Sequence, residues 1–373
     1  MKRARKKLKN YSTTASQFQK PLRIAQVAPL WVSIPPEKYG GIERIIHFLT
    51  EELVARGHKV TLFASGDSKT KAKLISVYPR GLLKDKISWT DPFWNLENLT
   101  ACFKMADKFD IIHSHLDLWT LFFQGLTKTP VLHTFHNQLY AGSVTSPEKF
   151  STRLKLFDKY RKEVNGVFIS QAEKKNSAVK FPKNWVVYNG IDVSQFKFHP
   201  KPKDHFIWIA RIDPFKGIEN AIKAAETAGA KLLLAGRLDP VRKQYFQTTI
   251  KPHLSKKIKY VGELSQSELS DFYGSARACL YPIEWEEPFG LIMVESMATG
   301  TPVIVFDRGS AREVVEDGKT GFVVKDIKEM VEAMKKIGQI DRSACRERVE
   351  RLFSFQKMVD EYEKIYYQLS KKK

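Results

Sequence analysis

The sequence has little of what marks secreted or membrane-spanning proteins. Its 373 residues include only three cysteines, Cys102, Cys279 and Cys345, whose spacing matches neither a disulfide framework nor a metal site. The longest apolar runs, such as residues 118–123, fall far short of the roughly 20 residues that cross a bilayer. The basic N-terminus is followed by polar residues, without the apolar part of a signal peptide. These absences predict a cytoplasmic chain with reduced thiols.

Motifs for metal binding are missing as well. No Asp-x-Asp pair occurs, and hence there is no evident carboxylate site for Mg²⁺ or Mn²⁺. The histidines in HSH (113–115) and HTFH (133–136) lack a cysteine or acidic residue at the spacing of a zinc site. We therefore expect neither a metal nor a bound cofactor.

Acidic residues are few relative to basic ones, mainly in the first half of the chain. The net charge is +21, and residues 1–200 hold 32 Lys and Arg against 16 Asp and Glu, whereas residues 201–373 hold 30 against 25. A one-sided basic field attracts nucleic acid, an anionic membrane or phosphorylated substrates. A basic surface that only favours solubility is the alternative. No motif that reads RNA or DNA is present, so nucleic acid is not an expected partner.

Strand-like and helix-like segments alternate from residue 21 onward. Runs that are apolar on both faces are typical of a parallel sheet covered by helices. The strands expected in the first half are 22–30, 58–66, 110–115, 130–136, 166–170 and 185–191. A polar segment with two prolines then reads as a linker, and the alternation restarts. The strands expected in the second half are 205–211, 231–236, 257–262, 278–283, 301–306 and 320–324.

This pattern predicts an α/β protein with two doubly wound domains. Such domains place a cleft at the carboxyl ends of their strands, where open α/β sheets bind ligands. The expected division is a basic tail (1–20), a first domain (21–192), a linker (193–205), a second domain (206–352) and a final helix (353–373).

The stretch EEPFGLIMVE places Glu287 and Glu295 eight positions apart, across an expected helix start. Pro288 suits the first helical turn, and Gly290 permits a close approach of the backbone. Apolar neighbours surround Glu295 within this helix, so its carboxylate needs a hydrogen-bonding partner. The helix start offers free N–H groups to a phosphate. The pattern indicates a ligand with an anionic centre and hydroxyls on both sides, such as a nucleotide-sugar.

A second motif, ARIDPFKG, places Arg211 after an apolar strand and Lys216 at the next helix start. Cations normally favour the other end of a helix, so this pair favours an anion between them. Fixed cations can neutralise a diphosphate leaving group as a metal would. Ordinary surface positions for both residues are the alternative.

Together these motifs resemble the retaining glycosyltransferases of family 4. EEPFGLIMVE is similar to the family's E-x7-E motif, and RIDPFK to its Arg-x4-Lys diphosphate clamp. YGGIERI (39–45) resembles its N-terminal glycine turn, and GSAREVVEDGKTGFVV (309–324) its C-terminal run. The resemblance covers about residues 21–370. It implies the GT-B fold, in which two Rossmann-like domains face each other across a cleft and the last helix crosses back to the first domain.

The resemblance also implies roles for single residues. Arg211 and Lys216 would hold the diphosphate, Glu295 the ribose hydroxyls and Glu287 the transferred sugar. The nucleotide base would lie near Leu264. The implied donor-binding residues are Gly41, Arg211, Lys216, Leu264, Glu287, Phe289, Gly290, Leu291 and Glu295. The implied catalytic residues are His136, Arg211, Lys216 and Glu287.

One histidine is expected near the sugar or its β-phosphate, as in many family members. His136 is the better match, with His113, His115 and His133 as alternatives. A histidine at a strand end with a purely structural role is the other interpretation.

The implied activity is transfer of a hexose-type sugar from a nucleotide-diphosphate sugar to a hydroxyl of a glycan or lipid-linked acceptor. UDP is the preferred nucleotide and GDP the next. The implied mechanism is metal-independent front-face displacement with retention. The alternatives are a related fold with other chemistry (a nucleotide-sugar epimerase or a disaccharide phosphorylase), a basic nucleic-acid-binding protein, and a scaffold without catalysis.

A basic amphipathic helix is expected over residues 153–166. Its apolar side chains alternate with lysines at helical spacing, so it could lie on an anionic membrane. Ordinary packing with a solvated basic face is the alternative. The first possibility would place the protein at the inner face of the cytoplasmic membrane.

Overall fold

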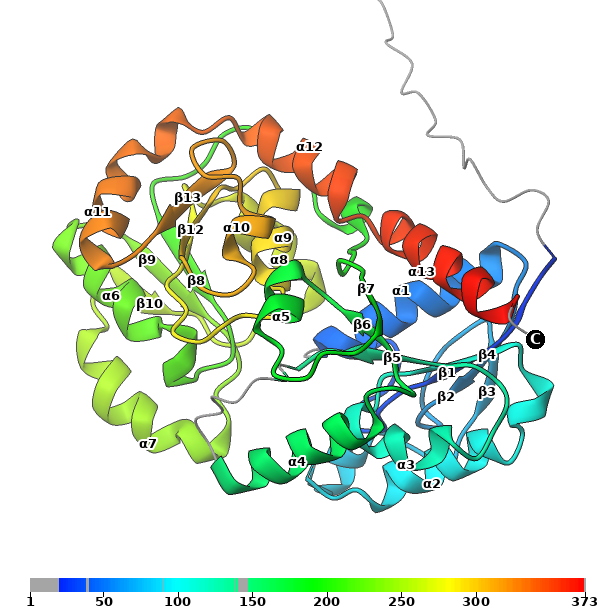
Figure 1. The fold of residues 1–373 in the computed structure, drawn as a ribbon. Coiled ribbons are helices and arrows are strands. Elements are labelled where there is room, and N and C mark those ends of the chain that lie inside the picture. Colours follow the sequence, from blue (N-terminus) through cyan, green and yellow to red (C-terminus); the bar gives the residue numbers. More distant parts are fainter. Residues whose placement is uncertain (1–19, 38–39, 89, 138, 140–146, 372–373) are drawn as a thin grey trace, which may run out of the picture.

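Figure 1 shows a computed structural model of the protein, which has two α/β domains side by side. The structure describes residues 20–37, 40–88, 90–137, 139 and 147–371. The basic tail expected at residues 1–20 lies outside the described residues, apart from Lys20.

The first domain is built on a seven-stranded sheet with the order β3-β2-β1-β4-β5-β6-β7, in which every pair is parallel. Its central strands β4 and β5 are buried throughout, as expected of strands in a parallel sheet that helices cover on both faces. The strands are β1 (Arg23–Val27), β2 (Lys59–Phe63), β3 (Lys73–Ile75), β4 (Ile111–Ser114), β5 (Val131–Phe135), β6 (Asn165–Phe168) and β7 (Lys183–Val186).

Two details of this sheet differ from the sequence prediction. The short, half-exposed edge strand β3 was not expected, because three residues carry too little alternation to be recognised. The strand expected over 185–191 is wrong in its bounds, since β7 ends at Val186 and residues 187–191 leave the sheet. The helices of this domain are α1 (Gly41–Ala55), α2 (Phe93–Phe103), α3 (Leu121–Gln124), α4 (Pro147–Tyr160) and α5 (Gln171–Asn176).

The second domain has a six-stranded parallel sheet with the order β10-β9-β8-β11-β12-β13. Its strands are β8 (Phe206–Ile209), β9 (Leu232–Ala235), β10 (Ile258–Tyr260), β11 (Cys279–Tyr281), β12 (Val303–Phe306) and β13 (Gly321–Val324). Its helices are α6 (Ile218–Thr227), α7 (Lys243–Tyr245), α8 (Gln266–Gly274), α9 (Leu291–Ala298), α10 (Ala311–Val314), α11 (Ile327–Lys336) and α12 (Arg342–Leu352). In both domains the first strand of the sheet lies in its middle, so the prediction of two doubly wound domains is confirmed.

The chain crosses between the domains at two adjoining places. The backbone N–H of Ile191 donates to the carbonyl of Phe353 at 2.9 Å, and the N–H of Phe355 donates back to Ile191 at 3.0 Å. A Cβ atom on Gly190 would lie 2.5 Å from the carbonyl oxygen of Ser354, so only glycine lets the two segments pass this closely.

Helix α13 (Phe355–Ser370) returns to the first domain and packs beside α1 (Figure 1). Its buried side chains, including Tyr362 and Tyr366, join the apolar core around Ile24 and Leu132. The predicted final helix that crosses back to the first domain is therefore confirmed.

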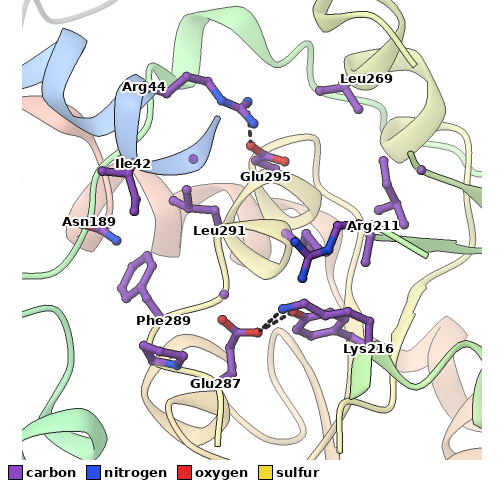
Figure 2. Close-up of a pocket in the computed structure, with 18 of the residues that line it drawn as sticks. Ile42, Arg44, Asn189, Arg211, Lys216, Leu269, Glu287, Phe289, Leu291 and Glu295 are labelled. Carbon is purple, nitrogen blue, oxygen red and sulfur yellow. Dashed lines mark hydrogen bonds and ion pairs between the residues drawn. The ribbon is translucent and has the colours of Figure 1, made fainter. Parts of the chain in front are cut away.

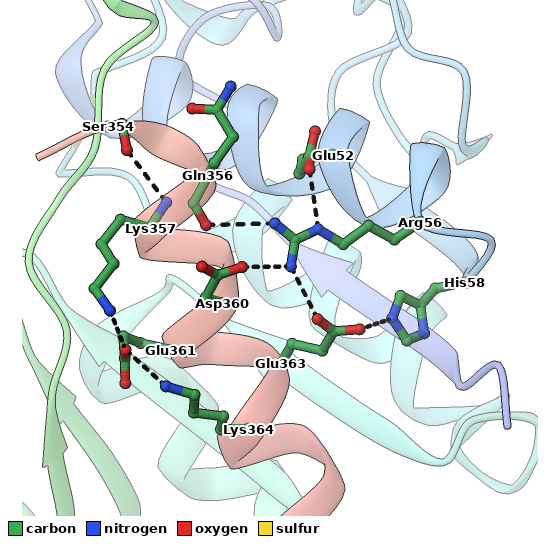
Figure 3. A network of polar contacts seen from close by, with 10 residues as sticks. All are labelled: Glu52, Arg56, His58, Ser354, Gln356, Lys357, Asp360, Glu361, Glu363 and Lys364. Atoms are coloured by element: carbon green, nitrogen blue, oxygen red, sulfur yellow. Dashed lines mark hydrogen bonds and ion pairs between the residues drawn. The ribbon is translucent and has the colours of Figure 1, made fainter. Parts of the chain in front are cut away.

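A polar network around Glu363 fixes α13 in place (Figure 3). The guanidinium of Arg56 donates to Glu363 at 2.9 Å and to Asp360 at 2.7 Å. The backbone N–H of Leu22 donates to Nδ1 of His58, so Nε2 of His58 carries the proton that Glu363 accepts at 2.9 Å. The hydrogen bond from His58, and next that from Arg56, lower the pKa of Glu363 to about 2 against the opposing effect of burial.

Replacing Glu363 by Gln is expected to lower the free energy of unfolding by about 1–3 kcal/mol at pH 7, because it removes the negative charge opposite Arg56 and one of the two acceptor oxygens. The folded-state pKa lies below the ordinary value of 4.5, so the stabilisation is complete above that pH and is lost as the pH falls toward 2. Urea unfolding of both proteins at pH 7 and pH 3 measures this. Glu361→Gln is the matched control, because the partners of Glu361 among the described residues are Lys357 and Lys364 on the exposed side of the same helix. An equal loss in both variants would contradict the role of Glu363.

The basic helix expected over 153–166 is α4, which ends at Tyr160. Its Phe157 is fully buried, with ring centroids 5.6 Å from Phe135 and 6.2 Å from Phe181, while Lys155 and Lys159 are exposed. The apolar side of the helix is thus packed within its own domain, which favours the alternative of ordinary packing. Within the described part of the chain, no helix has the length and apolar character needed to cross a membrane.

Candidate functional site

A pocket lies between the two domains, at the carboxyl ends of both sheets (Figure 2). Its volume is about 280 Å³, near the lower end of the roughly 300 to 1,000 Å³ typical of ligand sites. Every predicted site residue lines it: Gly41, His136, Arg211, Lys216, Leu264, Glu287, Phe289, Gly290, Leu291 and Glu295.

Glu287 is held by one of its two oxygens. Oε2 accepts hydrogen bonds from Lys216 Nζ at 3.0 Å, from the Tyr281 hydroxyl at 2.7 Å and from Trp285 Nε1 at 3.0 Å. Oε1 has no partner among the described residues. The buried carboxylate is therefore fixed in position and keeps one oxygen for a ligand hydroxyl.

Lys216 is positioned by local structure that the motif PFKG encodes. It is the last residue of a 3₁₀ turn (Pro214–Lys216). Asp213 caps the start of this turn, because its side chain accepts a hydrogen bond from the N–H of Phe215. Gly217 then reverses the chain with φ +70°, and its own Cβ would lie 1.8 Å from the carbonyl oxygen of Pro282. The ammonium lies 4.5 Å from the centre of the Trp285 ring, a cation–π distance. A fixed cation thus reaches the pocket although it stands at a helix start.

Arginines add to the positive charge of this region. Arg211 lies 3.8 Å from Asp213 and 4.0 Å from Asp239, distances that leave its guanidinium loosely held by carboxylates. Arg237 also lines the pocket and pairs with Asp239 at 2.7 Å. Arg237 was not predicted, because an arginine after the strand KLLLAG has no motif to distinguish it.

Glu295 has protein partners that the sequence did not reveal. Arg44 of α1 donates to its Oε1 at 3.1 Å from the opposite domain, and the Tyr273 hydroxyl donates to its Oε2 at 2.8 Å (Figure 2). Arg44 also donates to Gln266 of α8 at 3.1 Å. Arg44 and Tyr273 thus supply the hydrogen-bonding partners that the sequence led us to expect for Glu295, and its contact with a ribose stays a prediction. Only the fold brings Arg44 within reach, since 251 residues separate it from Glu295.

Helix α9 begins at Leu291, one residue after Gly290 with φ +80°. Pro288 therefore precedes the helix, and the expectation that it occupies the first turn is wrong. The first N–H groups of a helix have no hydrogen-bond partner within the helix. In α9 the first of these groups belongs to Leu291, which lines the pocket. From the other domain, Gly41 comes so close that its Cβ would lie 3.5 Å from Leu291 Cδ1. Both backbones thus approach any ligand at this point.

Of the four candidate histidines, only His136 lines the pocket. His113 hydrogen-bonds Tyr366 and Thr134, and His133 hydrogen-bonds Gln124, all within the first domain. His115 lies between these residues and His136. Nδ1 of His115 is 2.9 Å from Nε2 of His136. Burial lowers the pKa of His136 to about 4, so its imidazole is neutral at pH 7.

The described residues include no group of three or more His, Cys, Asp or Glu side chains that could hold a metal ion. The pocket itself offers a ligand the charges of its side chains and of the start of α9. In Figure 2, Arg211 lies between Glu295 and Glu287. This arrangement suits a ligand with an anionic centre and hydroxyl groups toward each carboxylate.

Two family models match the chain and together run from residue 39 to residue 351. The model described as glycosyltransferase family 4 matches residues 39–195, and the model described as glycosyl transferases group 1 matches residues 192–351. A phosphatidyl-myo-inositol mannosyltransferase of Mycobacterium tuberculosis is 24% identical over 339 residues, which cover 81% of this chain and 82% of that protein.

Solved structures share the arrangement of both domains. A sucrose-phosphate synthase from Thermosynechococcus elongatus superposes with a TM-score of 0.78 at 22% identity, over 94% of this chain and 100% of the other. The Anabaena protein HepE in complex with UDP and glucose gives a TM-score of 0.72 at 18% identity, over 93% of this chain and 100% of the other. At these identities the likeness is one of fold.

Proposed function

Because this chain belongs to glycosyltransferase family 4 and has the GT-B fold, we propose that it moves a hexose-type sugar from a nucleotide-diphosphate sugar to an acceptor hydroxyl with retention of configuration. The observation that carries this proposal is the position of Arg211 and Lys216 in one pocket with Glu287 and Glu295. Fixed cations and the start of α9 suit the diphosphate, and the two carboxylates suit the hydroxyls on either side.

The proposed mechanism is front-face displacement. The bond between the anomeric carbon and the β-phosphate oxygen breaks as the acceptor oxygen attacks from the same face, and the departing phosphate takes the acceptor's proton. Lys216 and Arg211 stabilise the charge that develops on the diphosphate, which requires no metal in this proposal. Glu287 Oε1 accepts a hydrogen bond from the sugar, and Glu295 binds the ribose beside Arg44.

The proposed donor carries UDP, with GDP as the next choice. The solved HepE complex, which holds UDP and glucose, supports the first choice, and the named mannosyltransferase supports a hexose. The proposed acceptor is a glycan or lipid-linked hydroxyl on the cytoplasmic side. The excess of basic residues in the first 200 positions suits an acceptor that carries negative charge.

Thermal melting with UDP, GDP or ADP, each with EDTA present, tests the donor proposal. At 100 times its Kd a nucleotide stabilises the folded protein by about 2.7 kcal/mol. We expect UDP to raise the melting temperature most, and to do so without metal. No shift with any nucleotide would overturn the proposal. A shift that appears only after Mg²⁺ is restored would overturn its metal-independent part.

A further inference from the structure

Three polar side chains are buried at the carboxyl ends of β1 and β4, beneath helix α13. Gln26 and His113 are fully buried, and His115 is 4% exposed. Burying such groups is costly unless each finds a hydrogen-bond partner. Their partners form a continuous chain from α13 to His136 in the pocket.

Gln26 stands at the centre of this chain. Its Nε2 donates to the Tyr366 hydroxyl of α13 at 3.0 Å, and its Oε1 lies 3.1 Å from His115 Nε2. An amide oxygen only accepts hydrogen bonds, so Nε2 of His115 must carry a proton. Burial lowers the pKa of His115 well below its usual range, which leaves the ring neutral. Its other nitrogen, Nδ1, is therefore an acceptor.

His136 continues the chain into the pocket. Its ring and that of His115 are inclined by only 25°, with centroids 5.2 Å apart, and Nε2 of His136 lies 2.9 Å from Nδ1 of His115. The two rings thus meet nearly edge to edge through one hydrogen bond. Because His115 Nδ1 accepts, His136 Nε2 donates. Nδ1 of His136, which has no partner among the described residues, is left as an acceptor at the pocket.

The hydrogen bonds on the α13 side of Gln26 agree with this assignment of donors and acceptors. The Tyr366 hydroxyl accepts from Gln26 and so donates to His113 Nδ1 at 2.7 Å. His113 Nε2 then donates to the Thr134 hydroxyl at 2.7 Å, which donates to the Tyr362 hydroxyl at 3.0 Å. The orientation of one amide, that of Gln26, therefore fixes the donor and acceptor of every bond in the chain.

We propose that Gln26 is a positioning residue that fixes the tautomer of His136, so that Nδ1 of His136 accepts a hydrogen bond from a hydroxyl of the transferred sugar. This inference rests on the proposed function of the same pocket. A phosphate oxygen only accepts hydrogen bonds, and so does Nδ1 in this tautomer, so His136 faces the sugar and not the diphosphate. Tyr366 and Gln26 thereby couple α13 to sugar recognition.

The tautomer can be read without any nucleotide, by ¹⁵N NMR of the histidine rings at pH 7. In the wild type we expect His136 to be protonated on Nε2 and bare on Nδ1. Tyr366→Phe removes the hydroxyl that accepts from the Gln26 amide, so the amide can take either orientation and both tautomers of His136 should appear. Tyr367→Phe is the matched control on the same helix, since the partner of its hydroxyl among the described residues is the carbonyl of Lys20 at 3.2 Å. A wild-type His136 protonated on Nδ1, or a Tyr366→Phe spectrum unchanged at His136, would overturn the role of Gln26.

The contact with the sugar is tested by His136→Ala. We expect its Kd for UDP to stay within about threefold of wild type, and kcat/KM for the UDP-sugar to fall roughly tenfold or more through loss of one hydrogen bond. Tyr366→Phe should show a smaller loss of the same kind. Equal losses for UDP and the UDP-sugar would place His136 at the phosphate and overturn the inference. If no nucleotide binds the wild type, the proposed function and the sugar contact both fall, and the spectra alone decide the role of Gln26.

Discussion

Lys216→Ala is expected to lower kcat by about 100- to 1,000-fold, the usual cost of removing one preorganised group that stabilises charge in the transition state. The Lys216 ammonium stands beside Glu287 and over Trp285, so it is already in place before the leaving diphosphate gains charge. The fold should tolerate the change, because Tyr281 and Trp285 still hold Glu287.

Release of UDP from the UDP-sugar, measured under saturating donor, reports kcat, and a melting curve reports the fold. Lys223→Ala is the control, because Lys223 is an exposed lysine on the helix that follows and lies away from the pocket. We expect this control to keep wild-type turnover. Turnover by Lys216→Ala within threefold of wild type would remove Lys216 from the proposed mechanism.

Gly217→Ala is expected to lower the free energy of unfolding by at least about 3 kcal/mol, and the melting temperature by roughly 10 °C. Two costs add up at this position. The backbone has φ +70°, which disfavours any side chain, and the new Cβ would lie 1.8 Å from the carbonyl oxygen of Pro282. Because this carbonyl is backbone, the clash can be relieved only by moving the turn that carries Lys216.

Two other glycines separate these costs. Gly229 has φ +62° with no atom closer than 3.9 Å, so Gly229→Ala should show only the backbone strain, about 1 kcal/mol. Gly338 has nothing within 4 Å of an added Cβ, so Gly338→Ala should be nearly neutral. Urea unfolding of the three variants should rank them in this order. A Gly217→Ala protein as stable as Gly229→Ala would contradict this prediction, because it would show that the turn carrying Lys216 can move at little cost.

The sequence was sufficient to predict the strands that carry the two sheets, because apolar runs such as FIWIA leave few alternatives. The short strand β3 and the early end of β7 were missed, because three or four residues at a sheet edge hold little periodic signal. The two-domain fold, the returning helix and membership of family 4 are confirmed. The individual roles assigned to the pocket residues stay predictions.

Within the site, the sequence predicts residues that stand in compact motifs and misses those brought in by folding. Glu287 and Glu295 belong to one stretch, and Arg211 and Lys216 to another. Arg44 looks like any arginine on an amphipathic helix until α1 and α9 meet across the pocket. Gln26 likewise reads as a polar residue in an apolar strand, and α13, more than 300 positions later, supplies one of its two partners.

The two chain crossings, at Ile191 and Ser354, lie side by side and form one narrow connection between the domains. The domains also touch away from this connection, where the backbone N–H groups of Gln171 and Ala172 donate to the Glu313 carboxylate. The Arg44–Glu295 ion pair is a further contact between the domains, so a rotation of one domain against the other would have to break it. Gly190 keeps the two crossing segments close together, because a Cβ atom at that position would push them apart. A ligand that fills the pocket would touch residues of both domains and so add to these contacts.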